Sequence, residues 1–156
     1  MTKRGELSVG LVVTQVSPVL LYVGLIFALS SLPQAQVSTL TAPWLAFPHA
    51  DKAIHFIEYA FLGALGLRAL LLKGHGLSPR RAFPVMLALG GLCALIDELF
   101  QATVAARDSS ATDWLADIFG IFFGLLIVRL ILWRAGPFPP PARASAPSEE
   151  SESGLR

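Results

Sequence analysis

The sequence predicts an all-α integral membrane protein, built as a bundle of four transmembrane helices. Of its 156 residues, 54% are hydrophobic and only 15% are charged, whereas about a quarter of the residues in a soluble domain are charged. Four apolar stretches reach, or nearly reach, the roughly 20 residues that cross a hydrocarbon core of about 30 Å. Since backbone groups in lipid must be satisfied within their own segment, we expect each stretch to be a helix.

The first expected helix covers about 9–32 and is interrupted only by Gln15, Pro18 and a few small hydroxyl-bearing residues. Basic residues precede it, as they do in a secretory signal, but the apolar core of a signal is only about 7–15 residues long. We therefore expect a retained helix, with residues 1–8 as a short segment before it.

Three further expected helices carry ionisable residues within apolar runs. The third of the four is purely apolar only as far as Ile96 and then continues into two carboxylates. These three helices cover about 53–72, 82–102 and 114–133. Together with the first helix they form one transmembrane domain, 9–133.

The remaining composition excludes several classes of protein. Residues 134–156 are rich in Pro, Ser and Glu and are expected to form a disordered tail, because they cannot bury enough apolar surface. With Cys93 as the only cysteine, an intrachain disulfide and a cysteine zinc site are excluded. A net charge of +1 gives no general basic field, so no nucleic-acid partner is expected.

The basic residues predict that both termini are cytoplasmic. Ten of the twelve Lys and Arg residues belong to one side of the expected bundle, and only Lys52 and Arg107 to the other. Because positive residues mark the cytoplasmic face, we expect a multi-pass protein of the inner (cytoplasmic) membrane. Any binding or chemistry is then extracytoplasmic, since seven acids lie at or just inside that face: Asp51, Glu58, Asp97, Glu98, Asp108, Asp113 and Asp117.

Four polar residues near the start of the second helix share one helical face. His55 is four residues from both Asp51 and Tyr59, and three from Glu58. Ionisable residues inside a membrane cost about 2.5–3.5 kcal/mol on insertion scales and almost always face the bundle interior. This face is therefore either part of a functional site or a structural network that sets the helix register.

The third helix ends with a second polar group. Gln101 is four residues from Asp97 and three from Glu98. The two adjacent carboxylates point about 100° apart on a helix. We expect one of them to face the bundle and the other to meet the following loop, with Arg107 as the nearest cation in sequence.

The loop and the start of the fourth helix add a third polar group. Ser110 or Thr112 is expected to cap the helix, and Asp113 is favourable in its first turn. Asp113 and Asp117 lie four residues apart and share a face. The capping role alone also accounts for the loop residues.

The fourth helix also carries a series of small residues at four-residue spacing. Ala116, Gly120 and Gly124 form this series, which permits close approach of another helix. The pattern is a signal for packing, including packing in a homo-oligomer, and says nothing about chemistry.

No cofactor is required by these patterns. The chain lacks an HExxH zinc motif and the paired Glu-x-x-His motifs of di-iron bundles. A divalent cation is nevertheless compatible with several carboxylates gathered near lipid, which need a counter-charge. The residues that would supply an oxygen-rich set with one nitrogen ligand are Asp51, His55, Glu58, Asp97, Glu98 and Asp117.

Two stretches of the chain resemble the VanZ-like family of small bacterial membrane proteins. They read DKAIHFIEYAFLG (51–63) and DELFQATVAARDSSATDWLADIFGIFFG (97–124). Two departures are visible: Ala105-Ala106 stands where a Pro-Gly turn is common in the family, and Asp117 stands where Asn is usual. The residues that match the family pattern are Asp51, Lys52, His55, Phe56, Tyr59, Asp97, Glu98, Gln101, Arg107, Ser110, Asp113, Gly120 and Gly124.

The resemblance implies a multi-pass protein of the cytoplasmic membrane, and the name-giving member is associated with low-level resistance to the glycopeptide teicoplanin. Three functions remain open. The first is a protein whose partners are membrane lipids and a lipid-linked envelope ligand, bound or modulated at the extracytoplasmic site. The second is an intramembrane enzyme acting on a lipid headgroup, with Glu58, Asp97 or Glu98 as base and His55 as acid or metal ligand. The third is proton- or ion-coupled transport by a homo-oligomer.

Overall fold

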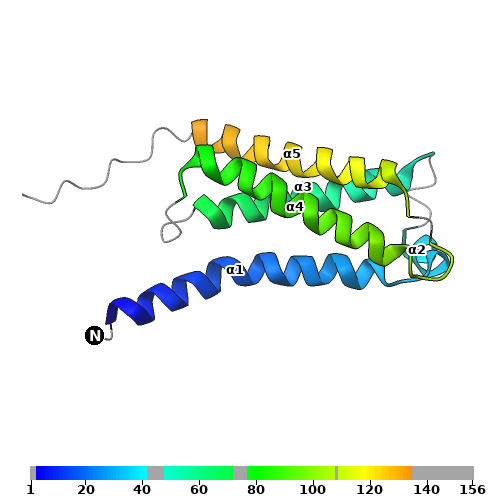
Figure 1. The fold of residues 1–156 in the computed structure, drawn as a ribbon, viewed down its shortest axis with the longest axis horizontal. Coiled ribbons are helices and arrows are strands. Elements are labelled where there is room, and N and C mark those ends of the chain that lie inside the picture. Colours follow the sequence, from blue (N-terminus) through cyan, green and yellow to red (C-terminus); the bar gives the residue numbers. More distant parts are fainter. Residues whose placement is uncertain (1–2, 42–47, 72–76, 108, 135–156) are drawn as a thin grey trace, which may run out of the picture.

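The computed structural model describes residues 3–41, 48–71, 77–107 and 109–134. These residues form five helices and no strand (Figure 1). The predicted tail from 135 onward, and Asp108 in the last loop, lie outside the described residues. The helices are α1 (Lys3–Ser30), α2 (Gln34–Thr41), α3 (Ala50–Leu71), α4 (Pro79–Gln101) and α5 (Ala111–Arg134).

Four of these helices, α1, α3, α4 and α5, are long and apolar enough to cross a membrane. The prediction of an all-helical, multi-pass membrane protein is confirmed. The helices begin earlier than predicted, at Lys3, Ala50, Pro79 and Ala111. The apolar runs mark the lipid-facing part only, whereas the polar first turns of α3 and α5 are also helical.

The helix α2 was not predicted and lies in the connection between the first two spans. At its start, the backbone amides of Gln36 and Val37 donate hydrogen bonds to the carbonyl of Pro33, at 2.9 and 3.2 Å. It is only eight residues long and its sequence, QAQVSTLT, is mostly polar. A search for apolar runs therefore passes over it.

The helix α3 lies at the centre of the bundle and packs most closely against α5. A Cβ atom added at Gly120 would lie 2.3 Å from the carbonyl oxygen of Phe56, and one added at Gly124 would lie 2.0 Å from that of Ala60. Ala116, one turn before Gly120, is half-buried. The small-residue face of α5 is thus covered by α3 of the same chain, which leaves it unavailable to a second copy.

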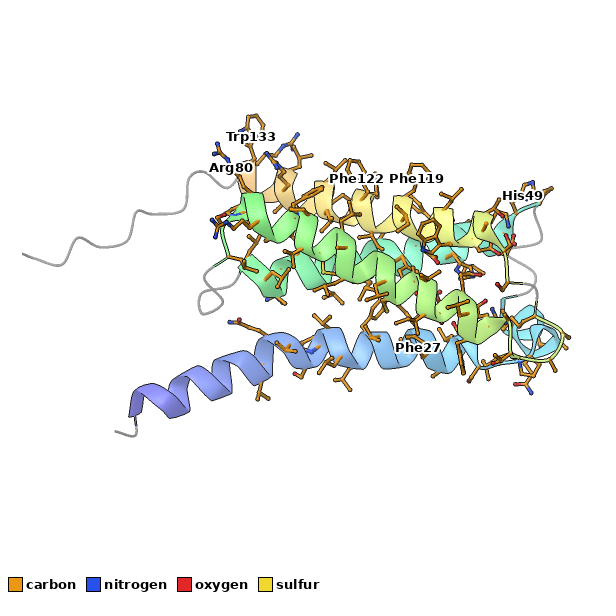
Figure 2. The ribbon with its side chains drawn as sticks, viewed as in Figure 1. Phe27, His49, Arg80, Phe119, Phe122 and Trp133 are labelled. Atoms are coloured by element: carbon orange, nitrogen blue, oxygen red, sulfur yellow. The ribbon has the colours of Figure 1, made fainter. Side chains whose placement is uncertain are left out.

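The outside of the bundle is apolar. Phe119 and Phe122 project outward from α5, and Trp133 lies near its end (Figure 2). The side chains of Leu21 and Trp133 are 75% and 77% exposed. Exposed apolar surface of this extent is what a lipid-facing helix carries.

The helix α1 lies at the periphery of the bundle, and its N-terminal part leads away from the other helices (Figure 1). Pro18 lies inside this helix, and proline removes a backbone hydrogen bond and bends a helix. The C-terminal half of α1 stays in contact with the bundle, where the rings of Phe27 and Phe100 lie 5.9 Å apart.

The two ends of the bundle differ in charge. At one end α1 and α4 finish and α3 and α5 begin (Figure 1); we call this the polar end, because the buried acids lie there. At the other end, which we call the arginine end, five arginines are all exposed: Arg68, Arg80, Arg81, Arg129 and Arg134.

Candidate functional site

The polar end brings together side chains from four helices that are far apart in sequence. Seven polar or charged residues are buried there, each less than 9% exposed. All but one of them, Ser30, are residues that the sequence predicted for the site. The seven are Ser30, His55, Asp97, Glu98, Gln101, Asp113 and Asp117.

His55 lies at the centre of this group. Its Nδ1 atom is 3.0 Å from Oδ1 of Asp117 on α5 and 3.8 Å from Oε1 of Glu98 on α4. The side chain of Asp117 is completely buried, and that of Glu98 is 6% exposed. One ring nitrogen of α3 thus faces two carboxylates from two other helices.

Glu98 also joins the helix end to the loop before α5. Its Oε2 atom accepts a hydrogen bond of 3.0 Å from the backbone amide of Ser110. The hydroxyl of Ser110 in turn accepts a hydrogen bond from the amide of Thr112. Ser110 is therefore the residue that caps α5. These contacts bear out the expectation that one of the adjacent carboxylates faces the bundle and the other meets the loop. Asp97 is buried in the bundle, and Glu98 accepts a hydrogen bond from the loop while its other oxygen faces His55.

Asp97 belongs to a second network that reaches α1. Its Oδ2 atom accepts a 3.0 Å hydrogen bond from Nε2 of Gln101, which also donates to Oγ of Ser30 at 3.1 Å. Arg107 donates to Oε1 of Gln101 at 3.0 Å and to the backbone carbonyls of Leu29 and Leu32 at 3.1 Å each.

Arg107 therefore serves another purpose than the predicted one. The sequence offered it as the nearest cation to Asp97 and Glu98 along the chain. Within the described residues it forms no ion pair. It instead holds the chain at the end of α1, by donating to the carbonyl of Leu29 in the last turn and to that of Leu32 just beyond the helix.

Lys52, which the sequence reasoning did not include in the site, pairs with two acids. Its Nζ atom lies 2.7 Å from Oδ1 of Asp113 and 3.0 Å from Oδ2 of Asp51. Asp113 is buried and Asp51 is exposed, so Lys52 spans from the interior to the rim. The sequence feature that could have assigned Lys52 to the site is its position about one helical turn before His55, within the DKAIHF stretch.

Tyr59 and Glu58 lie further along α3. Tyr59 is fully buried, and its hydroxyl is close enough to Asp97 for an electrostatic interaction. Glu58 is half-buried and precedes Tyr59 in the same helix. These two residues form the inner boundary of the group.

Several oxygen atoms at the polar end lack a hydrogen-bond partner among the described residues. They are buried and belong mostly to carboxylates that already use their other oxygen. The atoms are Oη of Tyr59, Oδ1 of Asp97, Oε1 of Glu98 and Oδ2 of Asp117. Buried polar atoms are satisfied in the great majority of cases. Because the Tyr59 hydroxyl lies close to Asp97, the atoms that point to a missing partner are those of Glu98 and Asp117.

A comparison with protein families gives a match to the model described as VanZ/LLP1, over residues 15–132. The chain belongs to the VanZ/LLP1 family. The matched region contains the whole polar end and all four spans except their outermost residues. No curated protein and no solved structure matches the chain.

The family turn before the last helix also has a structural counterpart here. Ala106 has a φ of 59°, in the left-handed region that glycine adopts without strain. It stands where the Pro-Gly turn of the family places its glycine. The backbone at Ala106 thus has a conformation that suits glycine although the residue is alanine.

Proposed function

We propose that this VanZ-family membrane protein binds the headgroup of a membrane-anchored cell-envelope ligand at its polar end, and thereby affects glycopeptide tolerance. The observation that carries the proposal is the group of buried carboxylates with unsatisfied oxygens. Ionisable residues at membrane depth are costly and normally mark a site of function. A purely structural network would be expected to satisfy its own acceptors.

The rim above the buried group suits a polar headgroup. Asp51 is exposed, and Lys52, Arg107 and Ser110 are half-buried, so both charge signs and a hydroxyl are accessible there. The unsatisfied atoms beneath are mostly acceptors. Hydroxyl and amino groups, as in sugars and amino-acid substituents of lipid-linked envelope polymers, are the complementary chemistry.

We further propose that the polar end faces the outside of the cytoplasmic membrane. The exposed arginines at the opposite end support this orientation, because positive residues accumulate on the cytoplasmic side. In a chain carrying Cys93→Ala, we expect Ser109→Cys to react with a membrane-impermeant maleimide in intact cells. We expect Ser78→Cys to react only after permeabilisation. The reverse pattern would place the polar end in the cytosol.

The binding function is tested in a teicoplanin-susceptible bacterium that expresses the chain. We expect the wild type to raise the minimal inhibitory concentration of teicoplanin and to reduce surface labelling by fluorescent teicoplanin. Glu98→Gln should lose both effects while being inserted at the same level, because it removes the charge that faces His55. The matched control is Leu99→Ala, whose side chain is 62% exposed on the outer surface. Equal protection by Glu98→Gln and the wild type would contradict the proposal.

A second function is favoured by one specific feature, the pairing of His55 with Asp117 at 3.0 Å. A carboxylate that orients an imidazole is the usual arrangement for a general base. The carboxylate of Glu98 also faces this ring nitrogen, Nδ1, at 3.8 Å. An enzyme acting on a lipid headgroup would release product from candidate envelope lipids in vesicles, and His55→Gln would abolish that release. Transport is less well supported, because the acids gather at one end and do not continue across the span.

A further inference from the structure

We infer that His55, Glu98 and Asp117 form a site for one divalent transition-metal ion, with Zn²⁺ as the favoured occupant. One atom from each of the three side chains lies within 4.8 Å of the other two, and all three residues are buried. They come from three different helices, α3, α4 and α5. The inference goes beyond the proposed function and does not depend on it, because it concerns metal binding by the isolated chain.

The distances fit a tetrahedral ion. With Zn–N and Zn–O bonds of about 2.0–2.2 Å, two ligand atoms in a tetrahedral site lie roughly 3.3–3.5 Å apart. The observed separations from Nδ1 of His55 are 3.0 Å to Asp117 and 3.8 Å to Glu98. A shift of less than half an ångström in each would bring these two separations to the tetrahedral value, and the two carboxylate oxygens lie within 4.8 Å of each other.

The hydrogen bonding around His55 is better explained by a metal ion between the three side chains than by a proton on Nδ1. A single proton on Nδ1 of His55 can be donated to Oδ1 of Asp117, but Oε1 of Glu98 is then left 3.8 Å away without a partner. Oδ2 of Asp117 also lacks a partner although its side chain is completely buried. A metal ion in place of that proton would bind all three side chains at once.

The charge balance points in the same direction. Glu98 and Asp117 are buried around a single imidazole, and Asp97 is buried next to Glu98 in the chain. Lys52 pairs with other acids, and Arg107 donates to Gln101 and to carbonyl groups. A divalent ion would supply the missing positive charge inside the bundle.

The donor types select the metal. An imidazole with two carboxylates suits Zn²⁺ or a neighbouring transition metal. Mg²⁺ demands six oxygen ligands in near-octahedral geometry and keeps several waters, for which a nitrogen ligand and a buried site are unsuitable. Three protein ligands also leave a fourth position of the ion for water or for a ligand oxygen, as in catalytic zinc sites.

The test uses the full chain, purified in detergent with a tag that contains no histidine. The chain is loaded with Zn²⁺, freed of excess metal, analysed for bound zinc and titrated against a chromophoric chelator. We expect about one Zn²⁺ per chain, and a loss of affinity of about 100-fold in Asp117→Asn, which removes one ligand charge without changing the size of the side chain. The matched control is Asp51→Asn, an acid at the same end that lies at the rim and should leave the affinity unchanged.

Thermal unfolding provides a second measurement. Zn²⁺ should raise the melting temperature of the wild type and of Asp51→Asn, because it binds only the folded state. It should not raise that of Asp117→Asn or of Glu98→Gln, which serves as a second ligand variant if the first does not fold. Absence of bound zinc in the folded wild type, or equal affinity in wild type and folded ligand variants, would overturn the inference.

Discussion

At the polar end of the bundle His55, Asp97, Glu98 and Asp117 are buried among four helices, whereas at the arginine end all five arginines are exposed. Both ends belong to the same helix bundle, and both carry several charged residues. They differ in what the charges contact. At the polar end the side chains contact each other and the backbone across helices, and at the arginine end they point to the surroundings.

This difference indicates separate roles for the exposed basic residues and the buried acids. Exposed basic side chains on long stems reach the membrane surface and serve orientation and anchoring. Buried acids with unsatisfied oxygens cost free energy in a membrane and are retained where they bind something. If this contrast is correct, substitutions should be costly at the polar end and nearly neutral at the arginine end.

The largest effect should come from the contact that holds both ends in one bundle. Gly124→Ala places a Cβ 2.0 Å from the backbone carbonyl oxygen of Ala60. Since backbone cannot move aside cheaply, α3 and α5 must separate, and we expect a loss of about 3 kcal/mol in the free energy of unfolding. Unfolding in mixed micelles with increasing SDS measures this change.

The matched control for that substitution is Gly24→Ala in α1. A Cβ at Gly24 would have nothing within 4 Å, and alanine is the better helix former. We expect no loss of stability. Equal destabilisation by the two variants would show that the close contact between α3 and α5 does not determine the free energy of unfolding.

A second effect separates the two ends directly. Arg107→Ala removes three hydrogen bonds, two of them to carbonyls at the end of α1, and we expect a loss of about 2–3 kcal/mol. Arg129→Ala at the arginine end removes an exposed side chain and should change stability by less than about 0.5 kcal/mol. Similar losses in both variants, measured by the same SDS titration, would remove the contrast between the ends.

The spans and the helical faces of the site were predictable from the sequence, because both follow from periodicity along one chain. The apolar runs located α1, α3, α4 and α5. Spacings of three and four residues placed His55, Asp97 and Asp117 on faces that turn out to be buried. Asp117, where the family resemblance leads us to expect Asn, is the most deeply buried of the three.

The pairing between helices was not predictable. His55 and Asp117 are 62 residues apart, and Lys52 and Asp113 are 61 apart. A helical face does not say which other face it meets. The partners of Arg107 were also invisible, because two of them are backbone carbonyls that every residue carries.

A third prediction uses the ion pair between Lys52 and the buried Asp113. Lys52→Met leaves Asp113, whose side chain is 8% exposed, without its 2.7 Å partner. We expect a loss of about 1–2 kcal/mol, because a carboxylate is left unpaired inside the bundle. Adding Asp113→Asn should recover part of that loss, since the amide needs no counter-charge. A thermal melt in detergent measures both variants, and a double variant weaker than the single one would contradict the pairing.

The smallest effect concerns the turn that carries Arg107 to its partners. Ala106 has a φ of 59°, a conformation that costs an L-residue roughly 1–2 kcal/mol and glycine almost nothing. Glycine loses more conformational freedom on folding, about 0.5–1 kcal/mol relative to alanine. We therefore expect Ala106→Gly to stabilise the protein by about 0.5 kcal/mol. Ala105→Gly, next to it and without a positive φ, should be neutral or slightly destabilising. If both glycines destabilise to the same extent in a thermal melt, the turn is not held in the left-handed conformation and the polar end is less rigid than its hydrogen bonds indicate.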